Sequence, residues 1–364
     1  MSTTCIRSFT RLHILLSRQA ATRPRLKTIY HAGSKIPNLR PLSSTPFRPV
    51  KARELRDQDL FAKPHFALSD VPPLSFWTSN VGPPIVLDGE VSPVECLEAC
   101  RRYASLALEN APGWQRRSIT TSTTTTGKRA SAPIPISILH YVALILLRVR
   151  GERQYMAAHI LYTGTTLNYA PAVLTMARLG VNASMLDKPA FAVAKEALGR
   201  LASSRASDPY YRADALTLLG LHHAQRGTPE GDNRALRCFE DAEKAAQAPD
   251  AAWQWRASAV LEQSRILVRR EQEDRAREAL RAALELDNAD VCFAYAMLLP
   301  ADDPERTPLL QRAAVSGVKG AAREMARIEE RRAAEEGLGA TERRIRQVIA
   351  DEWAAIAGDK AVLE

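Results

Sequence analysis

Apolar residues recur at steps of three and four positions along most of the chain between residues 134 and 337. This spacing places them on one face of an α-helix, and the alternation typical of β-strands is not found in this stretch. Alanine is abundant, while Gly and Pro stand mainly between the apolar segments, where they end helices. The pattern therefore predicts an all-α body over residues 134–337.

A separate helix is predicted over residues 92–113. Ser92 is a good N-cap, Pro93 suits the first helical position, and Glu95 completes a capping box. The sequence Ala-Pro-Gly then ends the segment. An apolar stripe at helical spacing indicates one buried face, which consists of Leu97, Cys100, Ala104 and Leu108.

The segments on either side of this helix lack a helical period. Residues 49–91 are dotted with prolines that prevent long helices, and their aromatic residues indicate an extended arm lying on a protein surface. Residues 114–133 contain a polar Ser/Thr-rich run of low complexity, which predicts a disordered loop. The prolines and aromatic residues of the arm include Pro72, Pro73, Pro83, Pro84, Phe61, Phe66, Phe76 and Trp77.

A short motif repeats within the helical body. It consists of an alanine, an apolar residue four positions later and another alanine three positions further on, as in Ala235, Phe239 and Ala242. The motif occurs again 45 residues upstream and 41 residues downstream, and a degenerate copy follows 30 residues later. These copies are Ala190, Ala194, Ala197; Ala276, Leu280, Ala283; and Leu310, Ala313.

Partner helices lie between the copies, and two of them end in Leu-Gly, at Gly180 and Gly220. Small alanines on one helix let its partner approach closely, and a large residue fills the gap between pairs. A single pair cannot bury its apolar face, whereas stacked pairs can. We therefore expect a superhelical array of helix pairs.

Two segments resemble known helical repeats. The segment LGLHHAQRGTPEGDNRALRCFEDAEKAA resembles a Sel1-like repeat, which has Leu-Gly, a glycine-rich turn, Lys/Arg-Ala and an aromatic-x-x-Ala helix. The segment AREALRAALELDNADVCFAYAMLL resembles the related tetratricopeptide repeat. The resemblance covers about residues 167–331 and implies a right-handed superhelix of antiparallel helix pairs. Because mitochondrial proteins of these families are often assembly or translocation factors for respiratory complexes, cytochrome oxidase included, it also implies a non-enzymatic interaction scaffold.

A capping helix with a short tail is predicted at residues 338–364. Thr341 suits the N-cap, and one apolar face serves as a lid for the last repeat; this face consists of Ile345, Ile349, Trp353 and Ile356. The alternative is a helix offered to a partner groove or a membrane surface, with Trp353 as its anchor.

The charge distribution separates the N-terminus from the rest of the chain. The net charge is +9, but residues 1–53 contain no Asp or Glu and hold 11 of the 50 Lys and Arg residues, which leaves 39 basic against 41 acidic residues, a net of −2. Arg7, Arg11 and Arg18 fall on one side of a helix and apolar residues on the other. We predict a disordered mitochondrial transit peptide over residues 1–48, with cleavage near Leu42, and a mature protein in the matrix or on the matrix face of the inner membrane. The alternative is a basic tail of a cytosolic protein.

No motif in the chain predicts catalysis, a cofactor, a metal ion or a small-molecule substrate. His222 and His223 are neighbours in sequence and point about 100° apart on a helix, so they cannot ligate one metal together. Cys96 and Cys100 form a single pair at i, i+4, which indicates buried thiols.

The most apolar run, residues 134–149, is too short for a membrane span and predicts a buried helix; the alternative is a peripheral contact with the inner membrane.

The partners that we expect are therefore proteins in mitochondria. Trp253 and Trp255 lie about 200° apart if helical, so at most one faces the core and the other is free to anchor a partner. The candidate partner-binding residues are Trp253, Trp255, Tyr210, Tyr211 and Trp353. The alternative function is that of a helical-repeat protein that binds mitochondrial transcripts. The near-neutral net charge of the chain beyond residue 53 disfavours it, because the neutralisation of RNA phosphates needs a basic groove.

Overall fold

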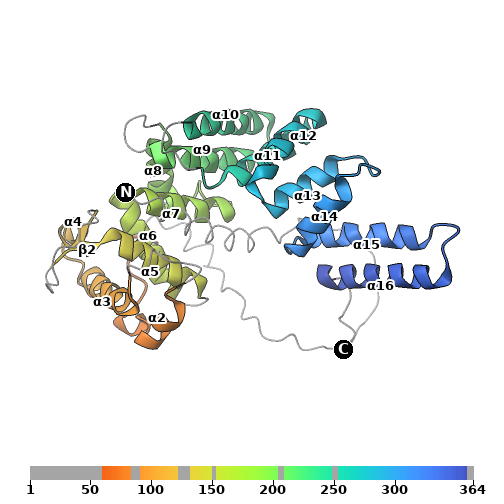
Figure 1. Ribbon diagram of the computed structural model, residues 1–364. Coiled ribbons are helices and arrows are strands. Elements are labelled where there is room, and N and C mark those ends of the chain that lie inside the picture. The colour runs from red at the N-terminus through yellow and green to blue at the C-terminus, as the bar shows by residue number, and fades with distance from the viewer. Residues whose placement is uncertain are drawn as a thin grey trace, which may run out of the picture. The chain divides into compact units, whose positions relative to one another are not determined.

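The computed structural model describes residues 60–82, 91–121, 132–149, 153–203, 209–247 and 253–358 (Figure 1). These residues form fifteen α-helices and two very short strands, so the prediction of a predominantly helical protein is confirmed. The chain divides into two compact units. Unit 1 comprises Met1–Leu218 and Ala245–Gln254, and unit 2 comprises Leu219–Lys244 and Trp255–Glu364. The predicted transit peptide, residues 1–48, lies outside the described residues.

Unit 1 is built from helices that contact their neighbours in sequence. Its elements are η2 (Leu68–Asp70), α2 (Leu74–Asn80), α3 (Pro93–Glu109), α4 (Trp114–Ser118), β1 (Ile119–Thr120), β2 (Ile134–Pro135), α5 (Ile136–Arg148), α6 (Arg153–Thr166), α7 (Ala170–Asn182), η3 (Pro189–Phe191), α8 (Ala192–Ser203) and the first part of α9 (Pro209–Ala224). α5 packs against α6, α6 against α7, and α7 against α8. α3 joins this stack through its contact with α5.

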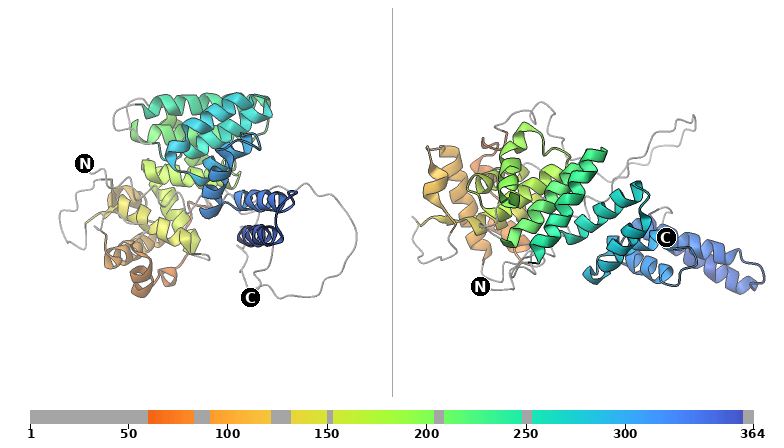
Figure 2. Two further views of the ribbon diagram at one scale, coloured as in Figure 1. Left: turned by 45° about the vertical axis from the view of Figure 1, so that its right-hand side comes forward. Right: turned by 90° about the horizontal axis from the view of Figure 1, so that it is seen from above.

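Unit 2 continues the same pattern of sequential contacts. Its elements are the end of α9, nearly all of α10 (Pro229–Ala246), α11 (Arg256–Arg269), α12 (Glu273–Ala282), η4 (Leu284–Leu286), α13 (Ala289–Leu298), α14 (Arg306–Val315), α15 (Lys319–Ala333) and α16 (Ala340–Ala357). From α11 to α16 every helix packs against the next one along the chain. α15 and α16 lie side by side, joined by a short loop (Figures 1 and 2).

The repeated motif positions form the buried side of the helices that carry them. In α10, Ala235, Phe239 and Ala242 are all buried, and the corresponding positions of α12 and α14 are buried as well. The two predicted Leu-Gly positions also have a packing role: the ring of Phe191 lies against Gly180, and the ring of Phe239 lies against Gly220. A side chain at either glycine would meet a phenylalanine ring, so both glycines allow close helix packing.

The predicted extended arm differs from the observed structure, because part of it is helical. α2 begins directly after Pro73, which is its N-cap, and buries Trp77, whose indole N–H donates to the Pro72 carbonyl at 3.0 Å. The short helix packs against α3. Two aromatic residues of the arm lie on unit 1 as expected: Phe61 stacks edge-on against Phe191, and Phe66 against His159.

The predicted helix at residues 92–113 is confirmed as α3. Ser92 and Glu95 form the expected capping box, with the Glu95 amide donating to the Ser92 hydroxyl at 3.2 Å. Leu97, Cys100 and Ala104 of the predicted stripe are buried, whereas Leu108 is exposed and Tyr103, which the stripe did not include, is fully buried. Asn110 ends the helix in a left-handed conformation.

The predicted loop at residues 114–133 is ordered at its start, which corrects the prediction for that part. Trp114 begins α4 and is buried, and Ile119 in β1 pairs in parallel with Ile134 in β2. Both isoleucines are buried, so this small bridge is held by apolar contacts at the point where the Ser/Thr-rich run begins. Residues 122–131 lie outside the described residues.

The apolar run at residues 134–149 forms the buried helix α5, as predicted; the two-residue strand β2 that precedes it was not predicted. Most of the α5 side chains are buried within unit 1, including Tyr141 and Leu144. Among the helices of the described residues, none is both long and apolar enough to cross a membrane.

The C-terminal helix is present as α16, but it presents a different face to the protein from the one predicted. Ala350 and Ala357 are buried, and Trp353 packs at the edge of the core formed by α13, α14 and α15. The remaining predicted lid residues, Ile345, Ile349 and Ile356, are exposed. The alanines allow α16 to lie close along α15, and this close contact turns the isoleucines outward.

Candidate partner-binding site

Trp253 and Trp255 lie in a turn that precedes α11, which corrects the helical geometry expected for them. Trp255 occupies the N-cap position and is only 7% exposed. Trp253 is half-buried, and its indole N–H donates to the Thr217 hydroxyl of α9 at 2.8 Å. One tryptophan is therefore a core residue, and the other keeps part of its ring at the surface of unit 1.

The other three candidates are spread over the molecule. Tyr211 is half-buried in the first turn of α9, the helix that also carries Thr217. The side chain of Tyr210 lies outside the described residues. Trp353 belongs to unit 2, where it packs against the core cluster beneath α16. The structure thus connects Trp253 with the helix of Tyr211, and it places Trp353 in the other unit.

Unit 1 contains a buried polar cluster that was not predicted from the sequence. The Tyr103 hydroxyl of α3 lies 2.6 Å from His159 Nδ1 and 2.8 Å from Thr163 Oγ1, both on α6. It also donates to the His159 carbonyl at 3.0 Å. The signal in the sequence was weak but present: Tyr103 stands three and seven residues after Cys100 and Cys96, so the helical period places all three on one face.

The chemistry of this cluster is that of a structural network. Burial lowers the pKa of His159 to about 4 and raises the pKa of Tyr103, so both groups are neutral near pH 7. A general base works best with a pKa close to the working pH, and His159 lies well below it. The hydrogen bonds of Tyr103 therefore satisfy polar groups within the core and join α3 to α6.

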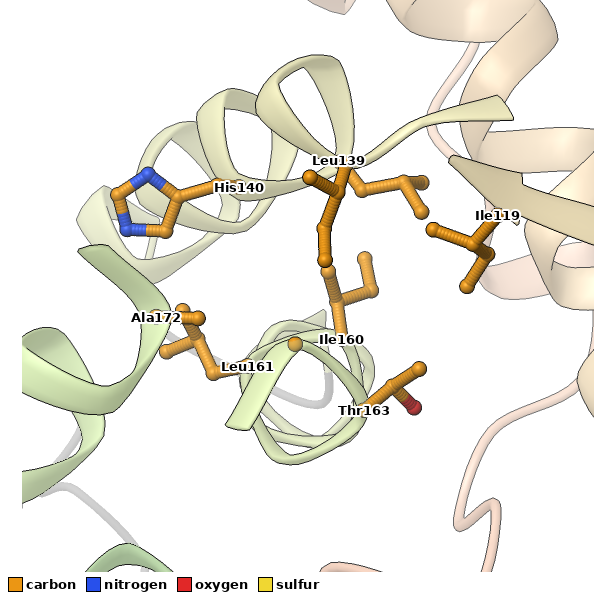
Figure 3. A pocket seen from close by; sticks show the side chains of 9 residues that line it. Ile119, Leu139, His140, Ile160, Leu161, Thr163 and Ala172 are labelled. Atoms are coloured by element: carbon orange, nitrogen blue, oxygen red, sulfur yellow. The ribbon is translucent and has the colours of Figure 1, made fainter. Parts of the chain in front are cut away.

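One small cavity lies between α5, α6 and α7 (Figure 3). Its volume is about 10 Å³, enough for no more than one water molecule. His140 lines this cavity and contacts the Thr175 hydroxyl at 3.0 Å; burial lowers its pKa to about 4. The cavity is too small for an organic ligand, and its remaining lining residues are Ile119, Ile136, Leu139, Ile160, Leu161, Thr163, Gly164 and Ala172.

The cysteines and the adjacent histidines have packing roles in the structure. Cys96 and Cys100 are buried as reduced thiols, and burial raises the pKa of each to about 12, which keeps them protonated and unreactive. His222 is buried and His223 half-buried at the end of α9. Across the described parts of the chain, no three His, Cys, Asp or Glu side chains are grouped so as to hold a metal ion.

Two buried carboxylates in unit 2 form ion pairs with partly exposed arginines, and these pairs join neighbouring helices. Glu329 of α15 is buried and accepts from Arg332 at 2.7 Å and from Arg346 of α16 at 3.0 Å. Asp232 of α10 accepts from Arg269 of α11 at 2.8 Å. The positive charge of each of these arginines is balanced by a carboxylate of the same chain, so the three together do not form a basic patch.

The comparisons with known proteins find no relative for this chain: no protein-family model matches it, and neither the curated proteins nor the solved structures contain a match.

Proposed function

We propose that this protein is a non-enzymatic interaction scaffold of mitochondria, in which the helices form a right-handed superhelix of antiparallel pairs. One observation carries the proposal: the spaced alanine-large-alanine positions are the buried positions of α10 and α12, with further copies buried in η3, α8 and α14. Such recurrence is typical of repeats that stack on one another. Stacked helices offer long surfaces to a protein partner.

Within this proposal the partner is a protein, and the half-buried ring of Trp253 is its first contact. Tryptophan is frequent at the centre of protein interfaces because its large ring is buried at low entropic cost. The Thr217 hydrogen bond holds the indole in one orientation before binding. A role in the assembly or translocation of a respiratory-chain complex such as cytochrome oxidase rests on the resemblance to Sel1-like and tetratricopeptide proteins.

Affinity purification from mitochondria, with and without RNase, tests the scaffold. We expect a defined set of proteins to co-purify with the full chain and to survive RNase, because the net charge of −2 beyond residue 53 gives little attraction for phosphate. Loss of the whole set on RNase treatment would instead identify an RNA-binding protein. Tyr211→Ala serves beside Trp253→Ala to map the contact, with circular dichroism to verify that each variant is folded.

Import with cleavage of the N-terminus is a second expected result. The acid-free segment with its arginine-lined helix suits import receptors, and Arg40 stands three residues before Ser43, near the expected processing site. N-terminal sequencing of the mature protein from mitochondria should therefore find a new end between about residues 35 and 50. A mitochondrial protein that still begins at Met1 or Ser2 would show that no such cleavage occurs.

A further inference from the structure

The outer side of α16 is an exposed aliphatic stripe. Four large side chains lie within about 100° of one another around the helix. Their exposed fractions are 54% for Ile345, 53% for Val348, 39% for Ile349 and 53% for Ile356. A helix that packs on one side against its neighbour normally turns a polar face to solvent on the other. α16 does the reverse, with alanines facing α15 and branched aliphatic residues facing outward.

Two charged side chains beside this stripe form no ion pair among the described residues, whereas Glu342 and Arg346 of the same helix do. Glu342 pairs with Arg346, Arg346 also pairs with Glu329, and Asp351 accepts from Gln347. Within the described residues, neither Arg344 nor Glu352 forms an ion pair. Glu352 lies within the stripe, and Arg344 lies at its edge on the side of Val348.

We propose that this face of α16 binds the same face of a second copy of the chain, in an antiparallel helix pair with its two-fold axis at Val348. Arg344 and Glu352 lie four residues before and four residues after Val348. In an antiparallel pair centred there, Arg344 of each copy is level with Glu352 of the other, because both lie about 6 Å from the axis along the helix. The pairing is self-complementary and forms at both ends of the contact.

The aliphatic residues fit the same register. Val348 meets its own copy at the axis, and Ile345 and Ile349 lie on either side of it. Ile356 of one copy covers the Thr341 end of the other, so the stripe is buried along its length. A two-fold contact of this kind closes on itself and gives a dimer, whereas a head-to-tail contact gives an open filament.

The charge of the stripe favours a protein over a lipid surface. A helix that lies on an anionic membrane carries an excess of Lys and Arg beside its apolar face. Here Arg344 is balanced by Glu352, and Glu342 stands next to the stripe on its other side. The arrangement therefore matches an oppositely ordered copy of itself and has no net attraction for anionic headgroups.

Sedimentation equilibrium of the full chain tests the dimer across the micromolar range. We expect a monomer–dimer equilibrium in the wild-type protein and a monomer for Val348→Glu, which places two carboxylates against each other at the axis. Arg344→Glu alone and Glu352→Arg alone should each weaken the dimer by about tenfold, because each turns two attractions into two repulsions. The double variant Arg344→Glu/Glu352→Arg should restore it.

The control is Glu330→Arg, a charge reversal of the same size at an exposed position of α15, which should leave the dimer unchanged. Thermal melts of each variant verify that the chain is folded. A wild-type protein that stays monomeric overturns the proposal, and so does a dimer that is indifferent to both single reversals. Binding of monomers to vesicles of phosphatidylcholine and cardiolipin, lost in Val348→Glu, would assign the stripe to a membrane instead. None of these outcomes depends on the scaffold function, which the purification experiment tests separately.

Discussion

Replacing Phe239 with alanine is expected to lower the free energy of unfolding by about 3–5 kcal/mol, the usual range for a buried phenylalanine. Its ring is 2% exposed and lies against Gly220, where the end of α9 meets α10. Because Gly220 has no side chain, nothing at that position can fill the cavity that the ring leaves. The loss therefore combines the transfer free energy of the ring with the full cost of the cavity.

The matched control is His223→Gln, a polar replacement at a half-buried position of α9, the helix against which Phe239 packs. It should cost far less, since it keeps a polar side chain of similar length and opens no cavity comparable with that of Phe239. Urea unfolding followed by circular dichroism measures both. If His223→Gln proves the more destabilising of the two, the assignment of Phe239 as the residue that fills the gap between paired helices is wrong.

The local rules of the sequence were enough to predict much of the helical architecture. The capping box at Ser92 and Glu95 predicts the start of α3 because both of its hydrogen bonds form within four residues. The alanine motif predicts buried positions such as Ala235 and Ala276 because helical spacing alone determines which side chains share a face. Such features need no knowledge of distant contacts.

Features that depend on contacts between helices could not be predicted in this way. In α16 the spacing of the isoleucines predicted a core face, but the alanines at 350 and 357 pack instead because they allow α15 to approach closely. The hydrogen bonds of Tyr103 could not be predicted either, because their partners His159 and Thr163 are supplied by α6. Periodicity shows that a helix has an apolar side, but the neighbouring helix decides which side is buried.

The tryptophan turn shows a limit of another kind. The angle expected between Trp253 and Trp255 assumed a helix, whereas α11 begins only at Arg256. One ring is nevertheless buried and the other partly exposed, for a different reason. Trp253 donates a hydrogen bond to Thr217, and Trp255 is buried at the N-cap position of α11. Helix ends are where sequence periodicity carries the least information.

Acidification from pH 7 to pH 5 is expected to destabilise unit 1 by about 4 kcal/mol, through His140 and His159 together. Burial lowers the pKa of each to about 4 in the folded chain, whereas a histidine of the unfolded chain has a pKa near 6.5. The unfolded chain therefore binds protons between these two values and the folded chain does not. The stabilisation is complete above about pH 6.5 and is lost as the pH falls toward 4.

The window between pH 7 and pH 5 separates the titration of histidines from that of carboxylates, which titrate near pH 4 in an unfolded chain. Thermal melts across this window should show a steady fall in the melting temperature, and the double variant His140→Gln/His159→Gln should flatten the slope. Should that variant fail to fold, histidine NMR signals of the wild-type protein provide the same test. Two of the seven histidines should not titrate above pH 5, and titration of all seven near pH 6.5 would contradict the expected pKa values.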